Sequence, residues 1–184
     1  MKVLHVTASL SHEWGGPVPV VKDLAKGLTQ KGVEVAIFAP INRAWLGGEV
    51  KPQGVDVRLF EQDWLSKIWT AHSFDLARVI YKEVWDFDLI HIHEIWHHPH
   101  FAAYRAAKRA GKPYVVTIHG ALEPWSLDYK AFKKRIYTAL VQRRVLNEAA
   151  AIHAITQDEV EHIKAFGVHS PIFMIPNGID PEEF

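Results

Sequence analysis

The sequence predicts an α/β fold, with a doubly wound, mainly parallel sheet of about seven strands and helices on both of its faces. The first reason is that short runs rich in β-branched residues alternate along the chain with longer stretches of helical periodicity. Strands that alternate with helices imply crossover connections, which cover both faces of a parallel sheet. The second reason is size, because 184 residues, of which 48% are hydrophobic, suffice for one domain with a substantial core.

The expected elements follow one another in a regular order. Short β-branched or apolar runs predict strands at residues 2–8, 34–39, 55–61, 88–93, 113–119, 151–156 and 172–175. Apolar residues at helical spacing predict helices at residues 18–30, 66–85, 100–110, 129–148 and 158–166. Residues 1–176 are therefore expected to form one domain. Because Pro176, Gly178 and Pro181 interrupt any regular element, residues 177–184 are expected to begin a hinge toward a further domain.

The composition argues against several classes of protein. The 21 Lys and Arg residues balance the 21 Asp and Glu residues, whereas a nucleic-acid binder normally carries a basic excess. The chain has no Cys, which excludes a disulfide framework and a thiolate metal site. The N-terminal apolar run is too short and polar for a signal peptide, and no stretch approaches the ~20 apolar residues of a membrane span. A cytoplasmic domain is expected.

A pair of glycines follows the first expected strand. In a doubly wound sheet, ligands bind beyond the carboxyl ends of the strands, where helix N-termini converge. Gly15 and Gly16 precede Pro17 and a helix, so backbone N–H groups and a positive helix end would face a phosphate. A tight turn that merely needs two glycines explains the pair equally well. The spacing matches neither G-x-G-x-x-G nor the P-loop, which argues against a self-contained site of either kind.

Histidines are concentrated in the stretch HIHEIWHHPH at residues 91–100. His91 and His93 project to the same face of a strand, so they could be metal ligands together with His97 and His98. In an interior parallel strand, however, a histidine is more often a hydrogen-bonded core residue than a ligand. A metal-dependent hydrolase built on these four histidines therefore stays open as an alternative function.

The same stretch carries side chains suited to a sugar. His93, Glu94 and Trp96 would lie at the carboxyl end of the expected strand 88–93. Polar side chains can bond hydroxyl groups while an indole stacks on a sugar face. This pattern favours a cleft that recognises a polyol over a metal centre.

A further histidine ends the strand expected at residues 113–119. His119 stands beside Gly120, which leaves an open approach for a ligand, and Glu123 and Trp125 follow in the same loop. A strand-terminating histidine can equally be held by a backbone hydrogen bond, and from the residues alone this interpretation is favoured.

The helix expected at residues 129–148 has a basic face. Lys130, Lys133 and Lys134 lie near its start, and its apolar residues repeat every four positions. Most such faces are simply solvated. The sharper hypothesis is that these lysines contact anionic lipid or a diphosphate acceptor at a membrane surface.

Taken together, the expected loops resemble a known family. The segments GGP, DLIHIHEIW, PYVVTIHG, AIHAITQDE and IPNGID, in this order, resemble the N-terminal half of the family 4 (group 1) retaining glycosyltransferases. These enzymes have the GT-B arrangement, in which two Rossmann-like domains face a cleft. Residues 120–154 further resemble the bacterial members that assemble exopolysaccharide, capsule or lipopolysaccharide on a lipid carrier.

The resemblance implies roles for particular residues. Gly15 and Gly16 would approach the donor diphosphate, and His119 would reach the donor sugar near the reacting carbon. Asn177 and Gly178 would form the hinge to the second domain. The acceptor would lie against loops that carry His93, Glu94, Trp96, Glu123 and Trp125. The family transfers sugar from UDP-, GDP- or ADP-sugars with retention, and without an obligatory metal or other cofactor.

The resemblance also limits what residues 1–184 can do. The family's nucleotide pocket, with its E-x7-E carboxylates, belongs to the second domain, which does not follow Phe184 in this sequence. We therefore expect an acceptor-side domain that is inactive alone and whose partners are the missing domain, a nucleotide sugar, a lipid-linked glycan acceptor and the inner face of the membrane. A non-catalytic carbohydrate-binding domain stays open as a second alternative.

Overall fold

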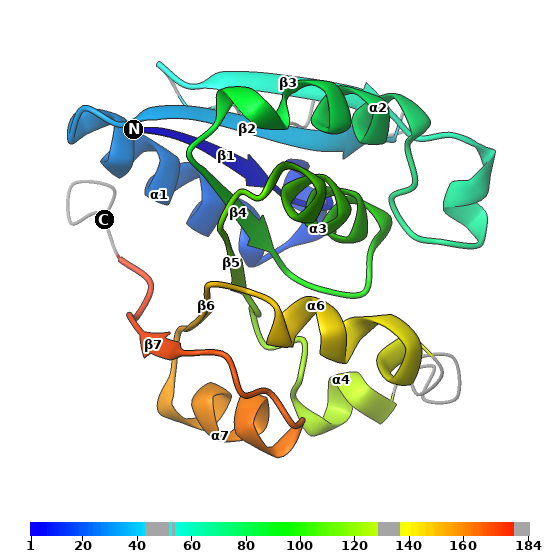
Figure 1. Cartoon of the computed structure of the whole chain (residues 1–184), viewed down its shortest axis with the longest axis vertical. Helices are drawn as coiled ribbons and strands as arrows, with labels where there is room; N and C mark the ends of the chain where they lie inside the picture. The colour runs from blue at the N-terminus through cyan, green and yellow to red at the C-terminus, as the bar shows by residue number, and fades with distance from the viewer. Residues whose placement is uncertain (43–51, 53, 129–136, 179–184) are drawn as a thin grey trace.

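A computed structural model describes residues 1–42, 52, 54–128 and 137–178. Its centre is one sheet of seven parallel strands in the order β3-β2-β1-β4-β5-β6-β7 (Figure 1). The strands are β1 (Lys2–Val6), β2 (Glu34–Ile41), β3 (Asp56–Glu61), β4 (Leu89–His93), β5 (Tyr114–Thr117), β6 (Ala151–Ala154) and β7 (Ile172–Met174). The strand order reverses between β1 and β4, which is where ligands bind in open α/β sheets. The predicted doubly wound sheet is therefore confirmed.

The connections supply helices to both faces of the sheet. They are α1 (Pro17–Gln30), α2 (Phe74–Glu83), α3 (His98–Ala110), α4 (Pro124–Asp128), α6 (Arg143–Asn147) and α7 (Gln157–Ala165). Short 3-10 helices occur at η1 (His12–Trp14), η3 (Trp64–Lys67) and η4 (Val84–Asp86), and η5 (Thr138–Gln142) is a π-helical turn before α6. No helix in the part of the chain that the structure describes is long and apolar enough to cross a membrane.

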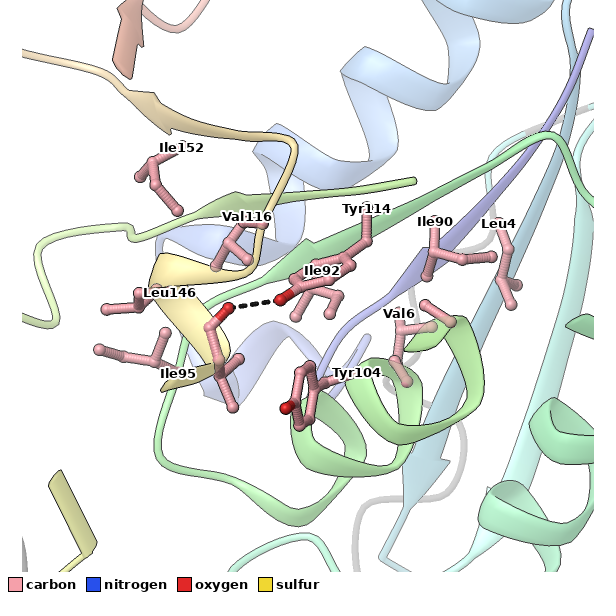
Figure 2. Close-up of a cluster of buried hydrophobic side chains, with 14 of the residues drawn as sticks. Leu4, Val6, Ile90, Ile92, Ile95, Tyr104, Tyr114, Val116, Leu146 and Ile152 are labelled. Atoms are coloured by element: carbon pink, nitrogen blue, oxygen red, sulfur yellow. Dashed lines mark hydrogen bonds between the residues drawn. The ribbon is translucent and has the colours of Figure 1, made fainter. Parts of the chain in front are cut away.

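Alternating side chains of the strands divide the core into two clusters. The larger one joins α2 and α3 to one face of the sheet and includes Leu4, Ile90 and Ile92. Figure 2 shows this cluster, in which the hydroxyl of Tyr114 donates to the carbonyl of Val145 at 2.6 Å. The smaller cluster packs α1 against the opposite face of β2. Since successive residues of a strand point to opposite faces, the histidines of β1 and β4 lie on the face opposite α2 and α3.

One predicted helix is shorter than expected. The helical pattern at residues 66–85 is broken because Ala71 has a positive φ of 61° and Ser73 caps α2, accepting from the N–H of Leu76 at 3.3 Å. Asp63 reinforces this break, since its carboxylate accepts from the N–H of Phe74 at 2.8 Å. Side-chain oxygens thus satisfy the N-terminal N–H groups of α2 where the periodicity suggested a continuous helix.

Candidate functional site at the carboxyl edge of the sheet

The loop after β1 contacts the loop after β4. The indole N–H of Trp14 donates to Glu94 Oε1 at 2.9 Å, although 80 residues separate them. The Trp14 ring also meets the edge of the His97 ring, with centroids 5.4 Å apart. These contacts place the glycine pair that follows Trp14 beside the β4 loop.

Glu94 is buried in a strained segment. Its φ is 69° and that of Trp96 is 78°, a left-handed conformation that non-glycine residues adopt at a cost of ~1–3 kcal/mol each. Only 8% of Glu94 is exposed, and its Oε2 has no partner at full hydrogen-bonding geometry, although the backbone N–H of Ala8 also interacts with the carboxylate. Burial raises the pKa of this carboxyl to about 7. Such strain and such an unpaired atom are features of functional sites rather than of ordinary loops.

Three imidazoles form a hydrogen-bonded chain across the sheet. His5 Nδ1 lies 2.8 Å from His93 Nε2, and His93 Nδ1 lies 3.2 Å from His119 Nε2. A neutral imidazole has one donor and one acceptor nitrogen, so both bonds must run in the same direction. The tautomer of His119 is therefore coupled to that of the fully buried His5.

A second chain runs beside the first. His153 Nε2 lies 2.8 Å from the carbonyl oxygen of Ile175, which can only accept, so Nε2 carries the proton. In the neutral ring Nδ1 then accepts from the hydroxyl of Thr117 at 3.0 Å, and that hydroxyl accepts from His91 Nε2 at 2.7 Å. The backbone carbonyl thus fixes the tautomers of two histidines.

Burial keeps His5, His91, His93 and His119 neutral. It lowers the pKa of His5 and His119 to about 4 and that of His91 and His93 well below the ordinary value. Desolvation is the main cause in all four, because a charged imidazolium loses its hydration inside the protein. The histidines can therefore give or accept hydrogen bonds near pH 7 without adding positive charge.

The loop after β5 is held by a buried carboxylate. His119 and Gly120 both have positive φ, 54° and 71°. The N–H of Gly120 donates to Glu159 Oε1 at 2.7 Å, and the N–H of Ile155 donates to Glu159 Oε2 at 2.7 Å. Glu159 thereby ties the loop after β5 to the loop after β6, and the turn directs the chain away from the sheet at His119.

The predicted cleft residues occupy different positions. Trp96 packs among aromatic side chains, and its indole N–H donates to the carbonyl of Ala121 at 3.1 Å. Trp125 is 71% exposed, and its N–H donates to Glu123 Oε2 at 3.0 Å. His93 is fully buried within the imidazole chain. Trp125 is therefore at the surface beside Glu123, whereas Trp96 and His93 are held by contacts within the loops and the sheet.

The glycine pair has room around it. A Cβ at Gly15 or Gly16 would meet no atom within 4 Å, but Gly15 has a φ of 90° whereas Gly16 is α-helical. Pro17 has no N–H, and the N–H groups of Gly15 and Val18 donate to carbonyls at 3.2 Å each. A ligand at the N-terminus of α1 would therefore meet the Gly16 N–H first.

Two predicted groups lie at the limits of the structure. Asn177 and Gly178 are exposed residues that follow β7 and end the described chain. Lys130, Lys133 and Lys134 lie outside the described residues, so the proposed basic contact surface stays a prediction.

The structure does not assemble the metal centre considered for the hydrolase alternative. His91 and His93 donate to or accept from side chains on the sheet. His98 instead packs on His72, with ring centroids 3.7 Å apart, and His97 lies beside Trp14 at the start of α3. The four histidines separate because a strand and a helix terminus send their side chains in different directions.

Comparison with known proteins decides the family. The glycosyl transferase 4-like domain matches residues 15–178, which is most of the chain. The chain belongs to the glycosyl transferase 4-like family. A search of curated protein sequences gave no match.

Solved glycosyltransferase structures share the fold of this family member. HepE from Anabaena, solved with UDP and glucose, is 18% identical with a TM-score of 0.67 over 98% of this chain and 45% of its own. Sucrose-phosphate synthase from Thermosynechococcus elongatus is 12% identical with a TM-score of 0.76 over 100% of this chain and 50% of its own. The lipopolysaccharide galactosyltransferase WaaB is 18% identical with a TM-score of 0.59, covering 98% and 46%. The chain thus spans about half the length of these GT-B proteins.

Several residues of the site were missed from the sequence. His5, Thr117 and His153 complete the two hydrogen-bonded chains, yet each lies in a different strand and carries no local signal. The T-x-x-E pattern at Thr156 and Glu159 does indicate a helix N-terminus. It gives no sign that the glutamate also holds the loop after β5.

Proposed function

We propose that residues 1–184 are the acceptor-side domain of a retaining glycosyltransferase, which moves a hexose from a nucleotide sugar to a lipid-linked glycan in surface polysaccharide synthesis. The main observation in support is that the loops after β1, β4 and β5 meet at one edge of the sheet. They are joined there by the Trp14–Glu94 and His93–His119 hydrogen bonds. Family membership supports the reaction class, and the half-length match supports a second domain beyond Asn177 and Gly178.

In this proposal the Gly16 N–H and the positive end of α1 receive the donor diphosphate. The departing nucleoside diphosphate gains negative charge in the transition state, and a fixed N–H stabilises it without reorganisation. HepE was solved with UDP and glucose, which makes a UDP-sugar the first donor to test. Cations of the second domain would complete the diphosphate site.

His119 is the catalytic residue of the proposal. Its Nε2 is engaged by His93, so the donor sugar would meet Nδ1. Because the ring is neutral at pH 7, it can bond a sugar hydroxyl as donor or acceptor without repelling a developing positive charge at the anomeric carbon.

The acceptor would lie near Glu94, Glu123 and the exposed Trp125. An exposed indole held by a hydrogen bond is suited to stack on a sugar face. Lys130, Lys133 and Lys134 follow α4 in sequence, and they would contact an anionic lipid surface or the diphosphate of a polyprenyl carrier. Such contacts would be consistent with an intact enzyme that works at the inner face of the cell membrane.

The test is a donor screen on the full-length protein. UDP-, GDP- and ADP-hexoses are incubated with lipid-extracted acceptors, and release of nucleoside diphosphate is measured. We expect turnover with one donor and none by residues 1–184 alone. Zinc-dependent hydrolysis in place of transfer would favour the metal hydrolase, and glycan binding without turnover would favour the carbohydrate-binding domain.

A further inference from the structure

Two clusters of three potential metal ligands occur in the described part of the chain. One is His5, His91 and His93, and the other is Glu94, His97 and His100. In the first cluster, His5 and His93 bond each other at 2.8 Å and His91 bonds Thr117 at 2.7 Å. His5 Nε2 has no partner, but an ion bound by all three histidines would compete with these two hydrogen bonds, so hydrogen bonding accounts for most of this cluster.

The second cluster has unused lone pairs. Glu94 Oε2 and both ring nitrogens of His100 are buried without a partner at full hydrogen-bonding geometry. The Ala8 N–H interacts with the Glu94 carboxylate and the Ile95 backbone with the His100 ring, but neither contact is a well-formed hydrogen bond to these atoms. Glu94 is 8% exposed and His100 is 3% exposed, so water does not replace the missing partners freely. Two polar side chains buried in this way at one place are costly unless something binds them.

The three side chains converge because of the local fold. Glu94 follows β4 with a φ of 69°, His97 is the N-cap residue of α3, and His100 lies in the first turn of that helix. Their ligand atoms lie within 4.8 Å of one another. In a tetrahedral zinc site with bond lengths of about 2.0–2.1 Å, the ligand atoms lie ~3.3 Å from one another. Side-chain rotations that shorten the distances between ligand atoms by up to about 1.5 Å would therefore form the site.

We propose that Glu94, His97 and His100 bind one divalent transition-metal ion of the zinc type. Imidazole nitrogen and carboxylate oxygen are ligands that zinc accepts, and three protein ligands leave a fourth position for water. The carboxylate also offsets the positive end of α3, which alone would disfavour a cation. The ion would hold the strained loop 94–97 and, through Trp14, the loop that carries the glycine pair.

This inference goes beyond the proposed function, whose transfer reaction requires no metal. It is tested by binding rather than by activity. Tag-free full-length protein is stripped with EDTA, dialysed and titrated with ZnCl2 by isothermal calorimetry, and bound zinc is counted by elemental analysis. We expect one tight ion per chain, and a rise in melting temperature when it binds.

The variants separate ligand loss from misfolding. Glu94→Gln and His100→Asn should each weaken zinc binding at least tenfold. Glu94→Gly removes the carboxylate and relieves the left-handed backbone, so it should lose the ion while folding as well as the parent. His98→Asn and His169→Asn are matched controls, one adjacent to the cluster and one exposed, and both should keep the site.

Three outcomes would overturn the inference. The first is no stoichiometric zinc in the parent protein. The second is binding that Glu94→Gly and His100→Asn leave unchanged. The third is binding lost in His5→Gln or His91→Asn instead, which would move the ion to the other histidine cluster.

Discussion

Replacing the buried His5 should make the free energy of unfolding depend less on pH in the acidic range. Burial lowers the pKa of His5 to about 4, against 6.5 in an unfolded chain. Between these values the unfolded state binds a proton that the folded state excludes, so stability falls as the pH falls through 6.5 and levels off below 4. From pH 7 to pH 5, this one group costs roughly 2 kcal/mol of unfolding free energy.

The perturbation is His5→Gln, which keeps a polar side chain beside His93 but cannot titrate. Urea denaturation at pH 7 and pH 5, followed by tryptophan fluorescence, gives the free energy of unfolding in each condition. The fall between the two pH values should be about 2 kcal/mol smaller in the variant than in the parent. His12→Asn, at an exposed site, is the control and should leave the fall unchanged. An equal fall in His5→Gln and the parent would refute the argument that His5 is buried and neutral.

The remaining predictions concern the site loops. Gly16→Val should abolish transfer by the full-length enzyme with the melting temperature unchanged, because its Cβ meets no protein atom; unaltered kcat would mean that the loop is only a turn. His119→Asn should lower kcat while folding normally, since Asn tolerates a φ of 54°; a collapsed melting temperature would assign the ring to the core instead. Glu159→Gln should cost about 2–3 kcal/mol in urea denaturation, because a carboxylate bonded to two backbone N–H groups is replaced by an amide; a change below 0.5 kcal/mol would contradict the role of Glu159 in joining the two loops.

The sheet was predictable because each strand and helix is specified by residues that are close together in the sequence. Alternating β-branched and helical patterns specify strands and helices one at a time, and right-handed crossovers then restrict their order. The exception at residues 66–85 is instructive. Asp63 and Ser73 bond the first N–H groups of α2, and this competition between side chain and backbone is invisible to apolar periodicity.

The site was only partly predictable because its contacts are not local. The positions of His119, Glu94 and the glycine pair at strand ends followed from the fold class. The hydrogen-bonded series from His5 through His93 to His119 connects residues of different strands and loops. No spacing in the sequence indicates that these residues are in contact. Trp96 was expected to lie in the acceptor cleft, and the sequence did not reveal that its indole N–H donates to the carbonyl of Ala121 in the loop after β5. Side-chain direction in loops with positive φ depends on tertiary contacts that sequence patterns do not contain.

The most direct test of the central claim is the stereochemistry of transfer by the full-length protein. An α-linked UDP-hexose, and GDP- and ADP-hexoses in parallel, are supplied with a polyprenyl-diphosphate-linked acceptor, and the anomeric configuration of the product is read by NMR. A retaining transfer should give an α-linked product, and this product should disappear in Gly16→Val. A β-linked product, or no transfer from any of the nucleotide sugars, would contradict the central claim.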